Sequence, residues 1–501
     1  MSQNSGSLKQ GGLAATMKLL AKDSFVFGGL GALTKFFALF LTPILTRFLT
    51  KEEYGVMDML TPILSITGTI IVMGMDSAVA RFYYHTDLEQ ERKEVISNGF
   101  WTQVITSVFV VILLYFLKGM ILRFYLKESY HPTHDLYLNV IAAVILLSVP
   151  IRFAQNLLIW TYDRKKYVIL SGGFIVVNFF SILCCVFSFD NKLLAVFFGQ
   201  LLPNLLFSVL AVLFIKKHII FNIHRKLLAK MLNYGMPLVV LAFIPALIPA
   251  LDRSAINNNF GLTQVANYGI GYRIATLIAL PISSINTALG PFILKLHKER
   301  NAERLFNIAT YSIIVVISSL ILLIVLLSPL IIRVLATEKY LPGVMVVAPL
   351  CFYFLVDGIR SICASGIDLS MKTYWNLILY PVGLIALFVL IKVMTPQFGI
   401  FGTALALFLT SVLNFILFSS VGSWLYPFKY NIGKKTLLIF FSFAIAYLIS
   451  MLQTLTHYYL YGTLLLILFP IAGFFVFLTR DEREQMVKVF RQRILKHQSE
   501  D

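Results

Sequence analysis

Basic side chains interrupt long apolar runs of this 501-residue sequence at several points. Lys35 and Arg273 each lie in a run without Asp or Glu, and Arg152 lies in another apolar run. A charge at the centre of a bilayer costs about 2.5–3.5 kcal/mol on insertion scales, so such residues usually face a bundle interior or a wet cavity. Guanidinium groups suit bidentate phosphate recognition, and the lysine ammonium adds a point charge. The pattern predicts a cationic cavity, formed by Lys35, Arg273 and Arg152, for a substrate that carries phosphate.

Further charged residues in or beside apolar runs extend this set. Arg47 and Arg81 lie near the ends of the first two runs, and Arg360 follows Asp357 by three positions in the tenth run. We include these three arginines as candidate substrate-binding residues, and Asp252 and Asp357 as candidates for coupling to an ion. Two alternatives stay open. Arg47 and Arg81 would instead fix topology or contact lipid headgroups, and Asp357 and Arg360 would neutralise each other on one helix face.

The composition indicates that lipid is the solvent for most of the chain. Hydrophobic residues make up 58% of it and charged residues 13%, against about 45–50% and about 25% in soluble domains. The mean hydropathy is +0.82. A helix that spans a hydrocarbon core about 30 Å thick needs about 20 apolar residues. We therefore expect an all-α polytopic membrane protein with about fourteen transmembrane helices, at 24–48, 55–80, 99–122, 136–160, 167–188, 193–215, 234–256, 264–289, 307–335, 343–366, 374–394, 399–421, 435–454 and 458–479.

The net charge of +18 reflects membrane topology rather than nucleic-acid binding. About two thirds of the 42 Lys and Arg residues fall in the two termini and in every second loop, which the positive-inside rule assigns to the cytoplasm. Both termini are therefore expected in the cytoplasm. Basic loops meet anionic lipid headgroups, so membrane lipids are expected partners and nucleic acid is not.

The apolar runs group into two halves of six helices. Tyr54-Gly55 and Tyr268-Gly269 lie at the start of the second and eighth runs, a weak repeat that favours parallel halves with the substrate site at their interface. The expected domains are a cytoplasmic tail (1–21), an N-terminal six-helix bundle (22–216), a cytoplasmic amphipathic linker (217–233), a C-terminal six-helix bundle (234–421), helices 13 and 14 (435–479) and a basic amphipathic cytoplasmic tail (480–501).

Signatures of catalysis do not occur in the sequence. It contains no GxSxG, P-loop or HExxH motif, and no outer loop with paired carboxylates. The four cysteines lie inside apolar runs without metal-ligand spacing. We therefore expect no enzymatic activity, no metal and no other cofactor.

The chain resembles a known transporter family at three places, residues 28–55, 230–238 and 268–274. The motifs PILTRFLTKEEYG (43–55), KMLNYGMPL (230–238) and YGIGYRI (268–274) are similar to signatures of the polysaccharide-biosynthesis flippases. This O-antigen oligosaccharide (Wzx-type) flippase family belongs to the multidrug/oligosaccharidyl-lipid/polysaccharide (MOP) exporter superfamily. The resemblance implies two six-helix bundles around a central cavity, plus two C-terminal helices. It further implies alternating access that moves an undecaprenyl-diphosphate-linked oligosaccharide to the outer leaflet.

The resemblance also implies roles for particular residues and a cellular setting. Basic residues of the early spans and of span eight line the cavity in such flippases, and Lys35 and Arg273 match those positions best. Arg47 matches a motif residue, and Asp252 lies in the seventh span, where some relatives couple to a cation. The implied location is the bacterial cytoplasmic membrane, where the protein would export O-antigen or other surface-polysaccharide repeat units to the cell envelope. Polysaccharide polymerase machinery is an implied partner.

Two other functions stay open. A MATE-like drug/cation antiporter of the same superfamily would favour unpaired carboxylates for its cationic substrates, whereas the lone embedded charges here are mainly basic. A membrane polysaccharide polymerase or ligase would need a large outer loop with a catalytic residue. The longest outer loop has about 15 residues.

Overall fold

The computed structural model describes residues 30, 33–34, 36–296, 302–426, 428–453 and 458–477, and helices joined by short turns make up this part. Lys35 and the predicted tails 1–21 and 480–501 lie outside the described residues. The chain divides into two compact units, residues 1–266 (unit 1) and 267–501 (unit 2).

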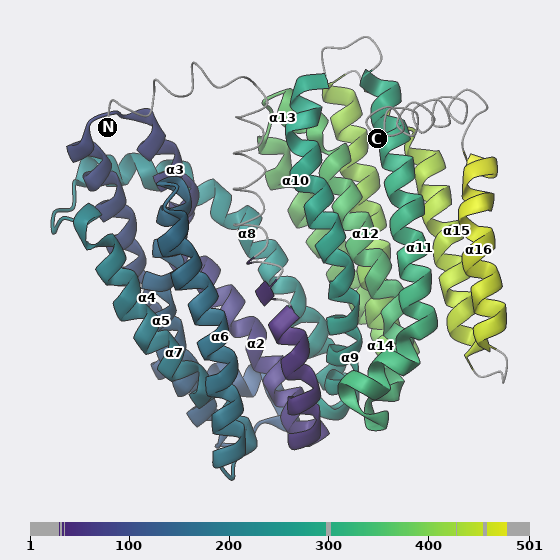
Figure 1. Ribbon diagram of the computed structural model, residues 1–501, viewed down its shortest axis with the longest axis horizontal. Helices are drawn as coiled ribbons and strands as arrows, with labels where there is room; N and C mark the ends of the chain where they lie inside the picture. Colours follow the sequence, from purple (N-terminus) through teal and green to yellow (C-terminus); the bar gives the residue numbers. More distant parts are fainter. Residues whose placement is uncertain are drawn as a thin grey trace, which may run out of the picture. The chain divides into compact units, whose positions relative to one another are not determined.

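Figure 1 labels the helices of both units. Unit 1 contains the short apolar helix Phe36–Phe48 and then α2 (Lys51–Val72), α3 (Met75–His85), α4 (Glu89–Leu126), α5 (His134–Trp160), α6 (Arg164–Ser188), α7 (Lys192–Ile215) and α8 (Arg225–Phe260). The limit between the units falls within α9 (Leu262–Ala275). Unit 2 continues with α10 (Ala279–Leu296), α11 (Ala302–Ala336), α12 (Val347–Cys363), α13 (Ser365–Leu369), α14 (Tyr374–Leu425), α15 (Ile432–Leu452) and α16 (Tyr458–Phe477).

Most of these helices have the length and composition of membrane spans. Within the described residues, 11 helices are long and apolar enough to cross a membrane, and Phe36–Phe48 and Tyr458–Ile471 are shorter apolar helices. The 52 residues of α14 form two helices that meet at Gly399, whose φ of 63° is not helical, and these helices correspond to the predicted spans 374–394 and 399–421. The predicted all-α polytopic membrane fold is confirmed, and the count of fourteen spans stays a prediction.

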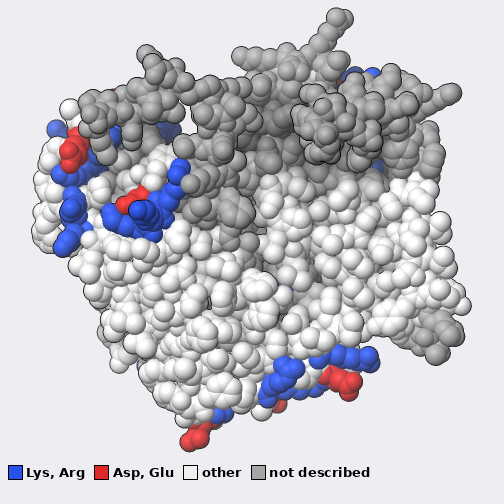
Figure 2. Space-filling view, in the orientation of Figure 1, with Lys and Arg blue, Asp and Glu red and all other residues white. Residues whose placement is uncertain are grey.

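Charged side chains gather at the ends of the helices. In Figure 2 the blue and red side chains lie toward the upper and lower edges of the view, and a white belt without them lies between. Ion pairs in the turns of unit 1 join Arg92 to Asp87 and Lys166 to Asp163. This distribution is typical of helices whose middle parts lie in hydrocarbon.

Each unit has its own hydrophobic core. In unit 1 the core joins α3 to α8, and the fully buried Phe153 packs edge to face against Phe100 at 5.3 Å between ring centroids. In unit 2 α12 is the central element, because it packs against α10, α11, α14 and α15 and buries Leu350, Phe352 and Leu355 completely.

The helical conformation is interrupted between α2 and α3, and α8 approaches the backbone closely at this point. Met73 and Gly74 have φ of 47° and 69°, a left-handed conformation that ends α2. A Cβ at Gly74 would lie 2.2 Å from the carbonyl oxygen of Gly235 in α8, so a larger residue would not fit there. α8 also packs against α3 and α4, which places it in unit 1. The units and the predicted domains therefore divide the chain at different positions, and the domain limits stay a prediction.

Candidate functional site

A polar pocket with a basic side chain lies in unit 1 between α2, α4 and α5. Its volume is about 460 Å³. Its polar lining residues are Ser65, Thr69, Gln103, Ser148 and Arg152. The side chain of Arg152 is exposed and, within the described part of the chain, makes no salt bridge. An accessible guanidinium group between membrane-spanning helices is suited to bind an anionic group.

Gly68 and Asp76 lie beside the Arg152 guanidinium group. A Cβ at Gly68 would lie 2.6 Å from Nη1 of Arg152, so the glycine leaves the space in which the guanidinium group packs on α2. Asp76 accepts a hydrogen bond from Nε2 of Gln103 at 2.9 Å and also interacts electrostatically with Arg152. The pocket therefore combines one cation with a nearby carboxylate that an amide holds in place.

The sequence alone selects only one member of this pocket, Arg152. Asp76 and Gln103 are polar residues inside the predicted spans 55–80 and 99–122, a signal that could have added them. Gly68 has no comparable signal, because its role depends on a neighbour in another helix.

A second charged group in unit 1, the Arg253 cluster, consists of Asp58, Asp252 and Arg253. Arg253 donates from Nε to Oδ2 of Asp58 at 2.8 Å and from Nη1 to Oδ1 of Asp252 at 3.0 Å. All three residues are buried, with 5% of Asp58, 0% of Asp252 and 5% of Arg253 exposed. The structure thus places the ion-coupling candidate Asp252 in an enclosed ion-pair cluster that joins α2 to α8.

The candidates Arg360 and Asp357 form an ion pair in unit 2. Nε of Arg360 donates to Oδ1 of Asp357 at 2.9 Å, and Nη1 donates to the hydroxyl of Tyr380 at 3.3 Å. The guanidinium group also lies over the rings of Tyr380 and Phe418. Arg360 is buried, whereas the side chain of Asp357 is half exposed. Asp357 and Arg360 therefore pair with each other on α12, as one of the two alternatives predicted.

The remaining candidates lie at separate places. Arg47 is exposed at the end of Phe36–Phe48, where Nη1 donates to the carbonyl oxygen of Pro43 at 2.9 Å. Arg81 of α3 is exposed and lies over the ring of Tyr234, 4.5 Å from its centroid. Arg273 is half-buried in the part of α9 that belongs to unit 2. A cavity that Arg273 shares with Lys35 stays a prediction.

Lys435 at the start of α15 is a buried cation that was not among the candidates. None of its surface is exposed, and Nζ donates to Oδ1 of Asn307 at 2.9 Å. The rings of Phe306, Tyr311 and Tyr430 surround the ammonium group at 6.0, 5.6 and 5.9 Å. Within the described residues, no carboxylate lies within salt-bridge distance of Lys435. Its surroundings are those of a structural contact between α11 and α15.

Known proteins share the fold and part of the sequence of this chain. The structure titled "Lipid II flippase MurJ, inward closed conformation" matches with a TM-score of 0.70 and 16% identity, over 90% of this chain and 98% of that chain. An inward-facing multidrug resistance MATE family transporter of the MOP superfamily matches with a TM-score of 0.64 and 13% identity, over 78% of this chain and 95% of that chain. The chain therefore has the fold of these membrane proteins.

The sequence comparisons identify the family. "Lsg locus putative protein 1" of Haemophilus influenzae (strain ATCC 51907 / DSM 11121 / KW20 / Rd) is 21% identical over 303 residues, which is 59% of this chain and 71% of that protein. The family model described as "Polysaccharide biosynthesis protein" matches residues 20–297. Because that match covers more than half of the sequence, the chain belongs to the polysaccharide biosynthesis protein family.

Proposed function

We propose that this multi-pass membrane protein is a flippase that moves an undecaprenyl-diphosphate-linked oligosaccharide, such as an O-antigen repeat unit, across the bacterial cytoplasmic membrane by alternating access. Membership of the polysaccharide biosynthesis family and the MOP-type fold support a transporter of this kind. The observation that carries the proposal is the exposed guanidinium group of Arg152 in a polar pocket between membrane-spanning helices.

The chemistry of the pocket suits a diphosphate with a sugar attached. A diphosphate that leaves water loses its hydration and needs charged or polar groups in exchange. Arg152 supplies the charge, and the hydroxyls of Ser65 and Thr69 with the amide of Gln103 supply hydrogen-bonding groups for phosphate and sugar oxygens. Asp76 interacts electrostatically with Arg152. In this proposal its carboxylate repels the diphosphate and so favours release, because a transport site must hold its substrate only transiently.

Other charged residues take secondary parts in this proposal. Lys35, Arg47, Arg81 and Arg273 are further cations along the substrate path. Asp357 is exposed and therefore accessible to a coupling ion, whereas Asp252 is enclosed with Arg253. We place Arg360 in a supporting role, in which it holds Asp357.

A flipping assay with purified protein tests the proposal. Proteoliposomes containing an undecaprenyl-diphosphate-linked oligosaccharide report flipping as exposure of the glycan to an added glycosidase. Arg152→Ala should lower the flipping rate by about tenfold to a hundredfold, because it removes charged hydrogen bonds worth about 1.5–3 kcal/mol. The matched control is Arg92→Ala, which removes an arginine paired with Asp87 at a helix end and should flip at the wild-type rate.

Three outcomes would contradict the proposal. Full flipping by Arg152→Ala would exclude the pocket as the diphosphate site. Wild-type protein that extrudes cationic drugs but flips no glycan would be a MATE-like antiporter. Protein that instead extends or transfers the glycan would be a polymerase or ligase.

A further inference from the structure

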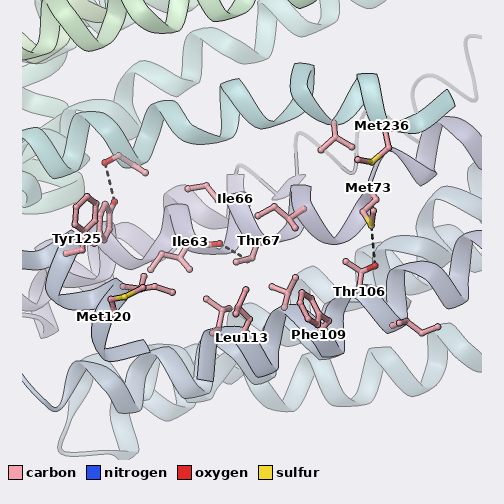
Figure 3. A pocket seen from close by; sticks show the side chains of 18 residues that line it. Ile63, Ile66, Thr67, Met73, Thr106, Phe109, Leu113, Met120, Tyr125 and Met236 are labelled. Carbon is pink, nitrogen blue, oxygen red and sulfur yellow. Dashed lines mark hydrogen bonds between the residues drawn. The ribbon is translucent and has the colours of Figure 1, made fainter. Parts of the chain in front are cut away.

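A long apolar groove runs along unit 1 between α2, α4 and α8 (Figure 3). Its volume is about 1020 Å³, and Ile, Leu, Val, Met and Phe dominate its lining. Figure 3 shows Tyr125 and Met120 at one end, and Met73, Thr106 and Met236 at the other. We propose that this groove binds the polyprenyl chain of the substrate while the head group crosses the membrane, an inference that rests on the proposed function.

The groove wall offers few polar groups to an occupant. The hydroxyl of Thr67 donates to the carbonyl oxygen of Ile63 at 2.6 Å, and that of Thr106 to the sulfur of Met73 at 3.4 Å. The Tyr125 hydroxyl lies 3.4 Å from a main-chain carbonyl oxygen of α8. Since these hydroxyls are engaged by the protein, the groove is suited to plain hydrocarbon.

The length of the groove distinguishes between two kinds of hydrocarbon. On α4 the lining extends from Ile105 to Tyr125, which is about 30 Å at 1.5 Å per residue. On α8 it extends from Met236 to Ala250, about 21 Å on the same scale. A phospholipid acyl chain occupies one leaflet, about 15 Å of a core about 30 Å thick. A single chain that fills the groove must therefore reach into both leaflets, as a long polyprenyl chain does.

One side of the groove is open, so a lipid chain can enter laterally. Phe109, Leu113 and Met120 line it and are 64%, 44% and 65% exposed. Methionines at both ends, Met120 and Met236, are flexible side chains that adapt to irregular shapes. Such a wall suits the methyl branches of a polyprenyl chain.

An exposed arginine lies near each end of the groove. Arg81 lies over the ring of Tyr234, two positions before the lining residue Met236. At the other end Arg123, between lining positions of α4, lies over the ring of Tyr130 at 5.4 Å. A diphosphate attached to a chain in the groove would therefore find a cation at the start and at the end of its passage. The apolar chain stays buried throughout, which avoids exposing it to water.

Binding measurements on adjacent residues of α4 test the groove. Leu113 lines it, whereas Ile112 is similarly exposed (50% against 44%) and is outside the lining. We compare undecaprenyl diphosphate with farnesyl diphosphate, which shares the head group but has a short chain, on the full-length protein in nanodiscs. Leu113→Trp should weaken the binding of undecaprenyl diphosphate by about tenfold, because the larger indole fills part of the groove and the chain loses apolar contact there. The effect on the binding of farnesyl diphosphate should be smaller. Ile112→Trp should change neither affinity.

Photocrosslinking provides a second test that does not depend on correct folding of the tryptophan variant. Benzoylphenylalanine at position 113 should crosslink radiolabelled undecaprenyl diphosphate, even in excess phosphatidylglycerol, and at position 112 it should not. Equal crosslinking at both positions, or capture of phosphatidylglycerol alone at position 113, would overturn the groove assignment. If the wild type flips glycan and binds both diphosphates equally well, the groove proposal is wrong and the flippase proposal is still supported. If the wild type binds neither diphosphate, both proposals fail.

Discussion

Arg152 and Arg253 both interrupt apolar helices of unit 1, yet they differ in exposure and in salt-bridge pairing. Arg152 is exposed in a polar pocket and, within the described residues, makes no salt bridge. Arg253 is 5% exposed and is held between the carboxylates of Asp58 and Asp252. A guanidinium group that is already paired and enclosed stabilises the contact between helices, whereas an accessible one can bind an external anion. The location of an arginine in a membrane span therefore does not by itself indicate a substrate site.

Lys435 in unit 2 represents a third arrangement. It is as buried as Arg253, but an amide and three aromatic rings take the place of carboxylates. Aromatic faces attract cations, and the attraction grows when water is excluded. Burial, together with partners supplied by the protein, marks both Arg253 and Lys435 as structural residues and separates them from Arg152.

The largest expected effect is that of Arg253→Ala. Removal of one partner from a buried ion pair leaves an uncompensated charge and costs about 3–5 kcal/mol. The variant should lose most of its thermal stability in detergent and accumulate poorly in the membrane. The same substitution at Arg152 should leave the unfolding temperature almost unchanged. Equal destabilisation of the two variants would remove the distinction between a structural and a binding arginine.

A smaller effect is expected for Asn307→Leu. This change removes the amide that accepts from Lys435 and that donates from Nδ2 to the carbonyl oxygen of Lys429 at 2.8 Å. The buried ammonium loses a hydrogen-bond partner, which costs about 1–3 kcal/mol of unfolding free energy. Asn259→Leu is the control, because the amide of Asn259 also bonds a carbonyl oxygen but is exposed. An unfolding midpoint equal to that of the control would show that the rings alone hold Lys435.

The membrane fold was predictable because its signal is local. Runs of apolar residues and the distribution of Lys and Arg depend only on neighbouring positions, and the corresponding helices are present in the described residues. The Asp357–Arg360 pairing could be anticipated for the same reason, since residues three apart share a helix face. The predicted spans 374–394 and 399–421 correspond to the two helical parts of α14, which meet at the non-helical Gly399.

The site depends on contacts that no local pattern contains. Asp58 and Arg253 are 195 positions apart, so the sequence offers no indication that they pair. Whether Arg152 faces a pocket or a carboxylate depends on the rotation of α5 against α2 and α4, which packing determines. The apolar groove is equally non-local, because its three walls come from helices that look like ordinary spans in the sequence.

The smallest change that should separate binding from stability is Gly68→Ala. A Cβ there would lie 2.6 Å from Nη1 of Arg152, and the flexible arginine can move away at little cost to the fold. Its displacement should lower the flipping rate by about tenfold, since a misplaced binding group loses orientation. Gly119→Ala provides the control, because no atom lies within 4 Å of a Cβ at that helical position, and it should keep the wild-type rate. If both variants flip equally well, the position of the Arg152 guanidinium group against α2 has no part in transport.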